Sequence, residues 1–122
     1  MLRIIVFCGL LSSCASLQSR PVGWSELGPH MSKHRIELSG VVDSTASALY
    51  LCPTLRVPSS FGGCVDLVAS PSIESELRAK REICTTVSGA FTSFQDGTIG
   101  IGNFRSDIGF IQAAHVAPCH ER

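Results

Sequence analysis

Five short segments of the chain are predicted to be β-strands, and turn residues separate them. The clearest is Arg35–Val42, which places Ile36, Leu38 and Val42 on one face. Gly40 falls on that same inward face, where it permits a sharp bend or bulge. The other four segments are residues 48–52, 64–69, 83–94 and 107–116. This pattern predicts a mainly β domain with one face of each strand buried.

One helical segment interrupts the strands between residues 70 and 82. Ser70 is expected to be the N-cap, and Pro71 takes the first helical position, where its missing N–H costs nothing. Acidic residues lie near the start of this segment and basic residues near its end, which complements the helix dipole. We therefore interpret the charged side as a solvent-exposed helix face, with Ile73 and Leu77 directed at the core.

The resulting order, β-β-β-α-β-β, resembles the OB-fold, a small five-stranded barrel with a helix between its third and fourth strands. The resemblance is one of topology and implies a mainly β fold: a small OB-like barrel with one short helix. Gly40 and Gly89 suit the strongly bent strands that close such a barrel. The alternative is a small β-sandwich, which usually needs about seven strands.

The first residues, MLRIIVFCGLL, place one arginine before an apolar stretch that is too short to span a bilayer, since spanning needs about 20 residues. This is typical of an export signal, with a buried first strand as the alternative. The next residues, Leu11-Ser12-Ser13-Cys14, resemble the bacterial lipobox. The resemblance implies cleavage before Cys14, acylation of its thiol and, with Ala15 following, a place on the periplasmic face of the outer membrane. We expect a signal peptide at 1–13, a flexible tether at 14–33 and an OB-like domain at 34–122.

Four further cysteines remain after Cys8 is removed with the signal and Cys14 is acylated. An even number in an oxidising compartment indicates two disulfides. The strand order favours Cys52–Cys64 and Cys84–Cys119, because each pair then spans two antiparallel strands with a turn at its centre. A four-cysteine zinc site is the alternative, but structural zinc sites usually bring their ligands in close pairs.

The net charge of the chain and the reactive side chains that it contains limit the classes of function that it can have. The chain has 10 Lys+Arg and 10 Asp+Glu, so no basic excess favours a nucleic acid as partner. We expect no cofactor and assign no catalytic residue, because both disulfides would leave no free thiol and nothing in the sequence selects a carboxylate pair. His34, His115 and His120 could together hold a metal ion, and they define the alternative function of a small-ligand or metal-binding lipoprotein.

The favoured hypothesis is a non-enzymatic binding or structural module of the cell envelope. It would attach to the membrane through its N-terminal lipid and bind an envelope protein or a glycan. OB-folds commonly bind through the loops that correspond here to residues 43–47 and 95–105. The candidate binding residues in these loops are Asp43, Ser44, Thr45, Gln95, Asp96, Asn103 and Arg105.

Overall fold

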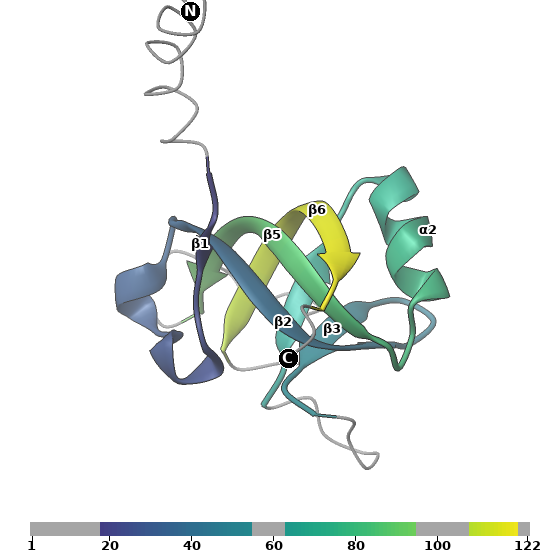
Figure 1. Cartoon of the computed structure of the whole chain (residues 1–122), viewed down its shortest axis with the longest axis horizontal. Helices are drawn as coiled ribbons and strands as arrows, with labels where there is room; N and C mark the ends of the chain where they lie inside the picture. The colour runs from purple at the N-terminus through teal and green to yellow at the C-terminus, as the bar shows by residue number, and fades with distance from the viewer. Residues whose placement is uncertain (1–17, 55–62, 95–107, 120–122) are drawn as a thin grey trace, which may run out of the picture.

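Five strands close into a barrel in the computed structural model, which describes residues 18–54, 63–94 and 108–119 (Figure 1). The strands are β2 (Arg35–Ser44), β3 (Leu49–Cys52), β4 (Val65–Val68), β5 (Cys84–Ser93) and β6 (Gly109–Pro118). One helix, α2 (Pro71–Ala79), connects β4 to β5. The OB-like barrel predicted from the element order is confirmed, and the β-sandwich is excluded.

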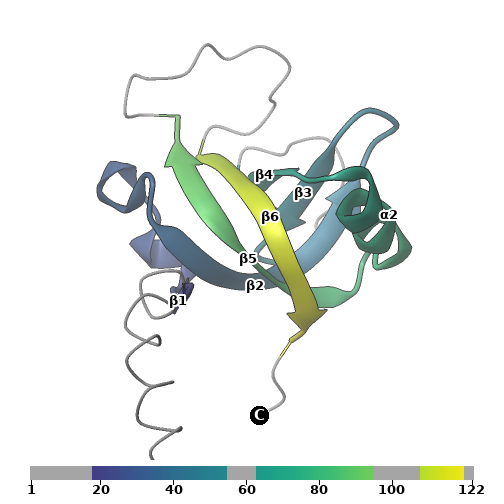
Figure 2. The ribbon, with the colours of Figure 1, turned by 90° about the horizontal axis from the view of Figure 1, so that it is seen from above.

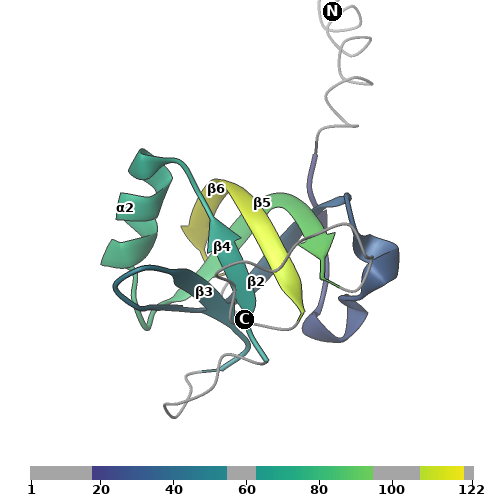
Figure 3. The same cartoon turned by 180° about the vertical axis from the view of Figure 1, so that it is seen from behind.

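The barrel closes because the long strand β2 pairs with two different strands, one along its first part and the other along its last part. Residues 35–41 of β2 pair with β5, and residues 41–44 pair with β3, both antiparallel. On the other side of the barrel, β6 pairs with β4 in parallel and with β5 in antiparallel orientation (Figure 2, Figure 3). The backbone of β2 comes very close to the backbone of β3 at one position, and only a residue without a side chain fits there. That residue is Gly40, since a Cβ there would overlap the carbonyl oxygen of Cys52.

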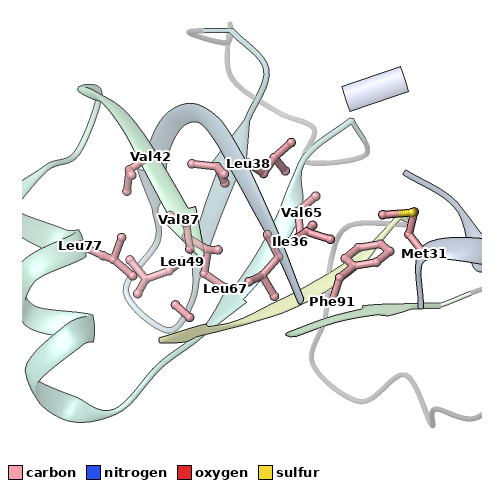
Figure 4. Packing of buried hydrophobic residues seen from close by; sticks show 13 residues of the cluster. Met31, Ile36, Leu38, Val42, Leu49, Val65, Leu67, Leu77, Val87 and Phe91 are labelled. Carbon is pink, nitrogen blue, oxygen red and sulfur yellow. The ribbon is translucent and has the colours of Figure 1, made fainter. Parts of the chain in front are cut away.

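The core is a single apolar cluster that fills the barrel from end to end (Figure 4). Ile36, Leu38 and Val42 of β2 are all buried, as the alternation in the sequence predicted. At one end α2 covers the barrel and directs Leu77, which is 0% exposed, into the core. Ser70 caps this helix by accepting a hydrogen bond from the backbone N–H of Ile73 at 3.5 Å.

Residues 20–33 cover the opposite end of the barrel, so the prediction of a flexible tether over 14–33 is wrong for this stretch. The stretch contains β1 (Arg20–Pro21) and two short 3-10 helices, η1 (Trp24–Glu26) and η2 (Pro29–Met31). Met31 is only 5% exposed and belongs to the core, where Figure 4 shows it beside Phe91. The composition of this stretch is typical of a linker, but its few apolar side chains are sufficient to close an open barrel end.

The same stretch also covers a free strand edge. Where β2 pairs with β5 but not yet with β3, its other edge is occupied by β1, which pairs with it in parallel. Farther along that edge, the Trp24 indole N–H donates to the carbonyl of Ser39 at 2.8 Å. Trp24 therefore packs on the edge of the domain and satisfies a backbone group of β2. An uncovered edge of this kind would be a template for pairing with another chain.

Both predicted disulfides are present, Cys52–Cys64 and Cys84–Cys119. Each joins two antiparallel strands one residue beyond the last pair of their ladder, Leu51 with Val65 in one case and Thr85 with Pro118 in the other. Val41 of β2 pairs with Cys52 on one side and with Cys84 on the other. The two bridges thus flank the point at which β2 changes its partner strand.

Candidate functional site

The turn between β2 and β3 carries three predicted binding residues, and its polar groups already have partners within the protein. Asp43 accepts a hydrogen bond from the backbone N–H of Ser44 at 2.8 Å and lies 3.6 Å from the Arg81 guanidinium. Thr45 Oγ1 accepts from the backbone N–H of Ala48 at 3.1 Å. These contacts hold the turn in one conformation.

The end of α2 fixes this turn from the other side. Arg78 Nη1 donates to the carbonyl of Thr45 at 2.9 Å, and Arg78 Nε donates to Glu74 Oε2 at 3.1 Å. The turn and the helix therefore form one unit in which the side chains of Asp43 and Thr45 are engaged in structural contacts. The remaining predicted binding residues, Gln95, Asp96, Asn103 and Arg105, lie outside the described residues, as does Cys14.

The predicted histidine site is not assembled by the described part of the chain. His34 lies just before β2, His115 lies on β6, and both are exposed, whereas His120 is outside the described residues. His34 is next to Phe91 of β5, while His115 pairs with Ser88 of the same strand. Among residues 18–54, 63–94 and 108–119, no three His, Cys, Asp or Glu side chains are grouped to hold a metal ion.

The outer face of β3 and β4, which OB-folds commonly use for ligands, presents few exposed side chains here. Tyr50 and Asp66 pair across these strands and point away from the barrel interior, yet they are 0% and 3% exposed. Tyr50 packs in a second buried cluster with the Cys52–Cys64 bridge. This face therefore differs from an open OB ligand surface.

Polar side chains also line the outer wall formed by β2, β5 and β6, where Ser39 and His115 are exposed, Glu37 is half-buried, and Thr86 and Ser88 are 3% and 7% exposed. Glu37, Ser88 and His115 lie in one cross-strand row, with Ser88 in the middle. Directly opposed residues of this kind have Cβ atoms about 4.5–5.5 Å apart. In the next row, Ser39 Oγ and Thr86 Oγ1 are hydrogen-bonded at 2.6 Å. We call the five residues Glu37, Ser39, Thr86, Ser88 and His115 the polar wall.

A bulge in β6 places His115 on this wall. Gly89 pairs with Ala113 and Ser88 pairs with His115, so Ala114 is an extra residue in β6. The extra residue reverses the alternation, which leaves His115 exposed and turns Val116 toward the core. The bulge accompanies a close approach of two backbones, since a Cβ at Gly89 would overlap the carbonyl oxygen of Gln112.

The order of side chains in this row suits binding better than nucleophilic catalysis. A Ser-His-acid triad needs the imidazole in the middle, so that the carboxylate orients the base that activates the serine. Here the hydroxyl of Ser88 lies between Glu37 and His115. The row instead presents the carboxylate of Glu37 and the imidazole of His115 on either side of the buried Ser88, and these two groups can donate and accept hydrogen bonds.

The strands that carry the polar wall could be predicted from the sequence, but the wall itself could not. Its residues are spread over three strands, and only the register of β2, β5 and β6 brings them together. The bulge could not be located from alternation alone, because neither set of alternate positions in β6 is apolar throughout: one contains Gln112 and the other His115. In the described part of the chain, no helix has both the length and the apolar character required to cross a bilayer.

Comparison with known proteins supports the fold alone. No protein-family model and no curated protein sequence matches the chain. Among solved structures, the chain is similar to the OBody AM3L15 bound to hen egg-white lysozyme, with a TM-score of 0.55 and 10% identity over 86% of this chain and 98% of that one. It is also similar to the OBody AM1L10 bound to the same lysozyme, with a TM-score of 0.51 and 12% identity over 85% and 97%. These likenesses agree with the OB-like barrel described above.

Proposed function

We propose that this protein is an exported, lipid-anchored OB-fold module that binds an envelope protein or a glycan without catalysing a reaction. The observation that carries the proposal is the polar wall, where Glu37, Ser88 and His115 are aligned across three paired strands. Side chains on paired strands are held in fixed relative positions, and such rigid presentation lowers the entropic cost of binding.

The anchoring part of the proposal rests on the sequence Leu11-Ser12-Ser13-Cys14, and the two disulfides are consistent with it. Disulfides persist in oxidising compartments such as the periplasm and are rare in the cytosol. Cys52–Cys64 and Cys84–Cys119 together leave no free thiol among the described residues. The module would thus act on the periplasmic face of the outer membrane.

The polar wall is a better candidate surface than the turn at residues 43–45. The side chains of Asp43 and Thr45 accept hydrogen bonds from their own turn, and Arg78 binds the Thr45 carbonyl. In contrast, Glu37 is half-buried and His115 is exposed, and both lie on strands that are paired with β5. Both side chains are available to a partner without breaking a contact that the barrel needs.

Site-specific photocrosslinking in growing bacteria that produce the protein tests this proposal. A photoreactive residue at His115 should yield a discrete adduct or a glycan-bound species, and the same residue at Glu76 on the exposed face of α2 should not. The double variant Glu37→Ala with His115→Ala should remove binding, whereas Ser75→Ala with Glu76→Ala should leave it unchanged. Equal adducts from both positions, or an unaffected double variant at the wall, would contradict the proposed surface.

Membrane fractionation tests the anchor separately. The chain should occur in the outer-membrane fraction with a diacylglyceryl mass on Cys14, and Cys14→Ser should release it as a soluble protein. An unmodified Cys14 would refute the lipoprotein assignment while leaving the binding surface open to the crosslinking test.

A further inference from the structure

The point at which the chain enters the barrel is fixed by the pairing of β1 with β2. The two strands are parallel, with Arg20 opposite Ile36, so the start of β1 lies beside the start of β2. Figure 1 shows β1 descending next to β2 from the N-terminal side. The residues that immediately precede β2, at 32–34, therefore surround the entry point. They are held there by hydrogen bonds from Lys33 N–H to the Phe91 carbonyl and from Phe91 N–H to the His34 carbonyl.

Folding of residues 20–33 onto the barrel shortens the connection to the membrane. This step rests on the acylation of Cys14 proposed above. From Cys14 to Arg20 there are six residue steps, which span at most about 20 Å when fully extended. A domain of about 100 residues has a radius of gyration of about 13 Å, so this reach is smaller than the diameter of the barrel. The entry end must therefore stay on the membrane side of the domain.

Among the described residues, basic side chains lie around the entry point. Lys33 and His34 are exposed, Arg35 follows them on β2, and His30 is exposed on η2. The stretch from residue 27 to 36 contains no Asp or Glu. The nearest carboxylates along the chain are Glu37, on the polar wall, and Glu26, which lies 3.9 Å from Arg20 and accepts a hydrogen bond from the Gly23 N–H at 2.6 Å.

The other end of the barrel differs in charge. There α2 and the turn after it mix acidic Glu74, Glu76 and Glu82 with basic Arg78, Lys80 and Arg81. Arg78 and Arg81 are paired with carboxylates, at 3.1 Å from Glu74 and 3.6 Å from Asp43. Among the described residues, the entry end thus combines nearness to the anchor with the basic side chains of Lys33, His34 and Arg35, and their nearest acidic neighbour in the sequence is Glu37.

We propose that the surface formed by His30, Lys33, His34 and Arg35 contacts the anionic phospholipid headgroups of the membrane in which the chain is anchored. Juxtamembrane basic residues are attracted to anionic lipid surfaces, and this attraction decays within a Debye length. The contact would orient the barrel so that the polar wall runs from its membrane end, near Arg35, toward the Cys84–Cys119 bridge at its distal end.

The chain offers an internal control for this orientation, because it has two lysines and they lie at opposite ends of the barrel. Lys33 lies at the entry point, and Lys80 is the C-cap residue of α2. The acylated protein is reconstituted into vesicles of phosphatidylcholine with phosphatidylglycerol, treated briefly with an amine-acetylating reagent and analysed by mass spectrometry. The ratio of Lys33 to Lys80 acetylation is compared with that of the Cys14→Ser protein in solution.

We expect the ratio to fall by about fivefold on anionic vesicles, the factor that corresponds to one basic residue near such a surface. High salt should restore the ratio.

Lys33→Gln with Arg35→Gln should weaken the sedimentation of the Cys14→Ser protein with anionic vesicles, and the matched Lys80→Gln with Arg81→Gln should not. An unchanged ratio with an acylated Cys14 would overturn the orientation, and equal protection on phosphatidylcholine alone would overturn the role of headgroup charge. A protein without acyl chains would instead refute the anchor.

Discussion

Truncation of Met31 to alanine tests whether residues 20–33 belong to the folded domain. Met31 is 5% exposed and closes the barrel end opposite α2, where it packs in the core with Phe91. If the stretch were a loose tether, the side chain would be exposed in solution and its removal would leave the stability unchanged. In the structure described here, Met31→Ala opens a cavity at the end of the barrel.

The expected loss follows from the burial of this side chain. Replacing a buried Leu, Ile or Met by Ala costs about 2–5 kcal/mol, and the cost depends on how far the surroundings collapse into the cavity. Met31 lies in a short 3-10 helix at one end of the core, where its neighbours can relax, so we expect about 2–3 kcal/mol. For a domain of about 100 residues this corresponds to a fall in Tm of roughly 10–20 °C.

Urea titration of the Cys14→Ser protein, with both disulfides intact, measures this loss. Trp24 is the single tryptophan and packs on the barrel edge, so its fluorescence reports unfolding of the same region. The midpoint should fall while the m-value stays constant, because the surface exposed on unfolding is nearly unchanged.

Two variants serve as controls for Met31→Ala. Met31→Leu keeps most of the volume and should cost less than about 1.5 kcal/mol. His30→Ala changes an exposed residue of the same 3-10 helix and should stay within about 0.5 kcal/mol of the unmodified protein. If Met31→Ala is as mild as His30→Ala, the closure of the barrel by residues 20–33 is refuted.

Four further changes probe other parts of the fold. Gly89→Ala should prevent soluble expression or lower stability by more than about 3 kcal/mol, because its Cβ would overlap the backbone of β6; yield and thermal melting measure this. Trp24→Phe removes the hydrogen bond to the β2 edge and should cost about 1 kcal/mol in urea titration. Arg78→Met frees the β2–β3 turn and should speed amide exchange there, with a stability loss of about 0.5–1.5 kcal/mol. Joint replacement of Cys84 and Cys119 by Ala should cost about 3–4 kcal/mol, and a loss below about 1 kcal/mol would contradict the loop-entropy argument.

The strand β2 could be predicted from the sequence because it is half-buried, with alternate residues directed into the core. A strand with one solvent-exposed face and one buried face alternates polar and apolar residues. Residues 35–42 follow this pattern, and their apolar side chains are buried in the core. The helix was equally predictable, since Ser70, Pro71 and the Glu74–Arg78 pair act locally. Both disulfides followed from the strand order, because adjacent antiparallel strands bring their ends together.

The N-terminal stretch was misjudged for an equally physical reason. Residues 20–33 show no periodicity and are rich in Gly, Pro and Ser, which is typical of a linker. Their structure depends on a surface that they do not contain, the open end of the barrel and the unpaired edge of β2. Met31 packs in the core and Trp24 donates a hydrogen bond to β2, and no local signal distinguishes such residues from isolated apolar residues in a linker.

From the sequence alone came the five barrel strands and their helix, the favoured pairing of the cysteines and the resemblance of Leu11–Cys14 to a lipobox. These properties depend on neighbours a few residues apart, or on the connection of consecutive strands. Only the tertiary structure decided that β2 exchanges partners at Val41, that a bulge in β6 turns His115 outward, and that Glu37, Ser88 and His115 share one row. Strand register and barrel closure join residues that are up to about eighty positions apart, and alternation within a strand carries no information about them.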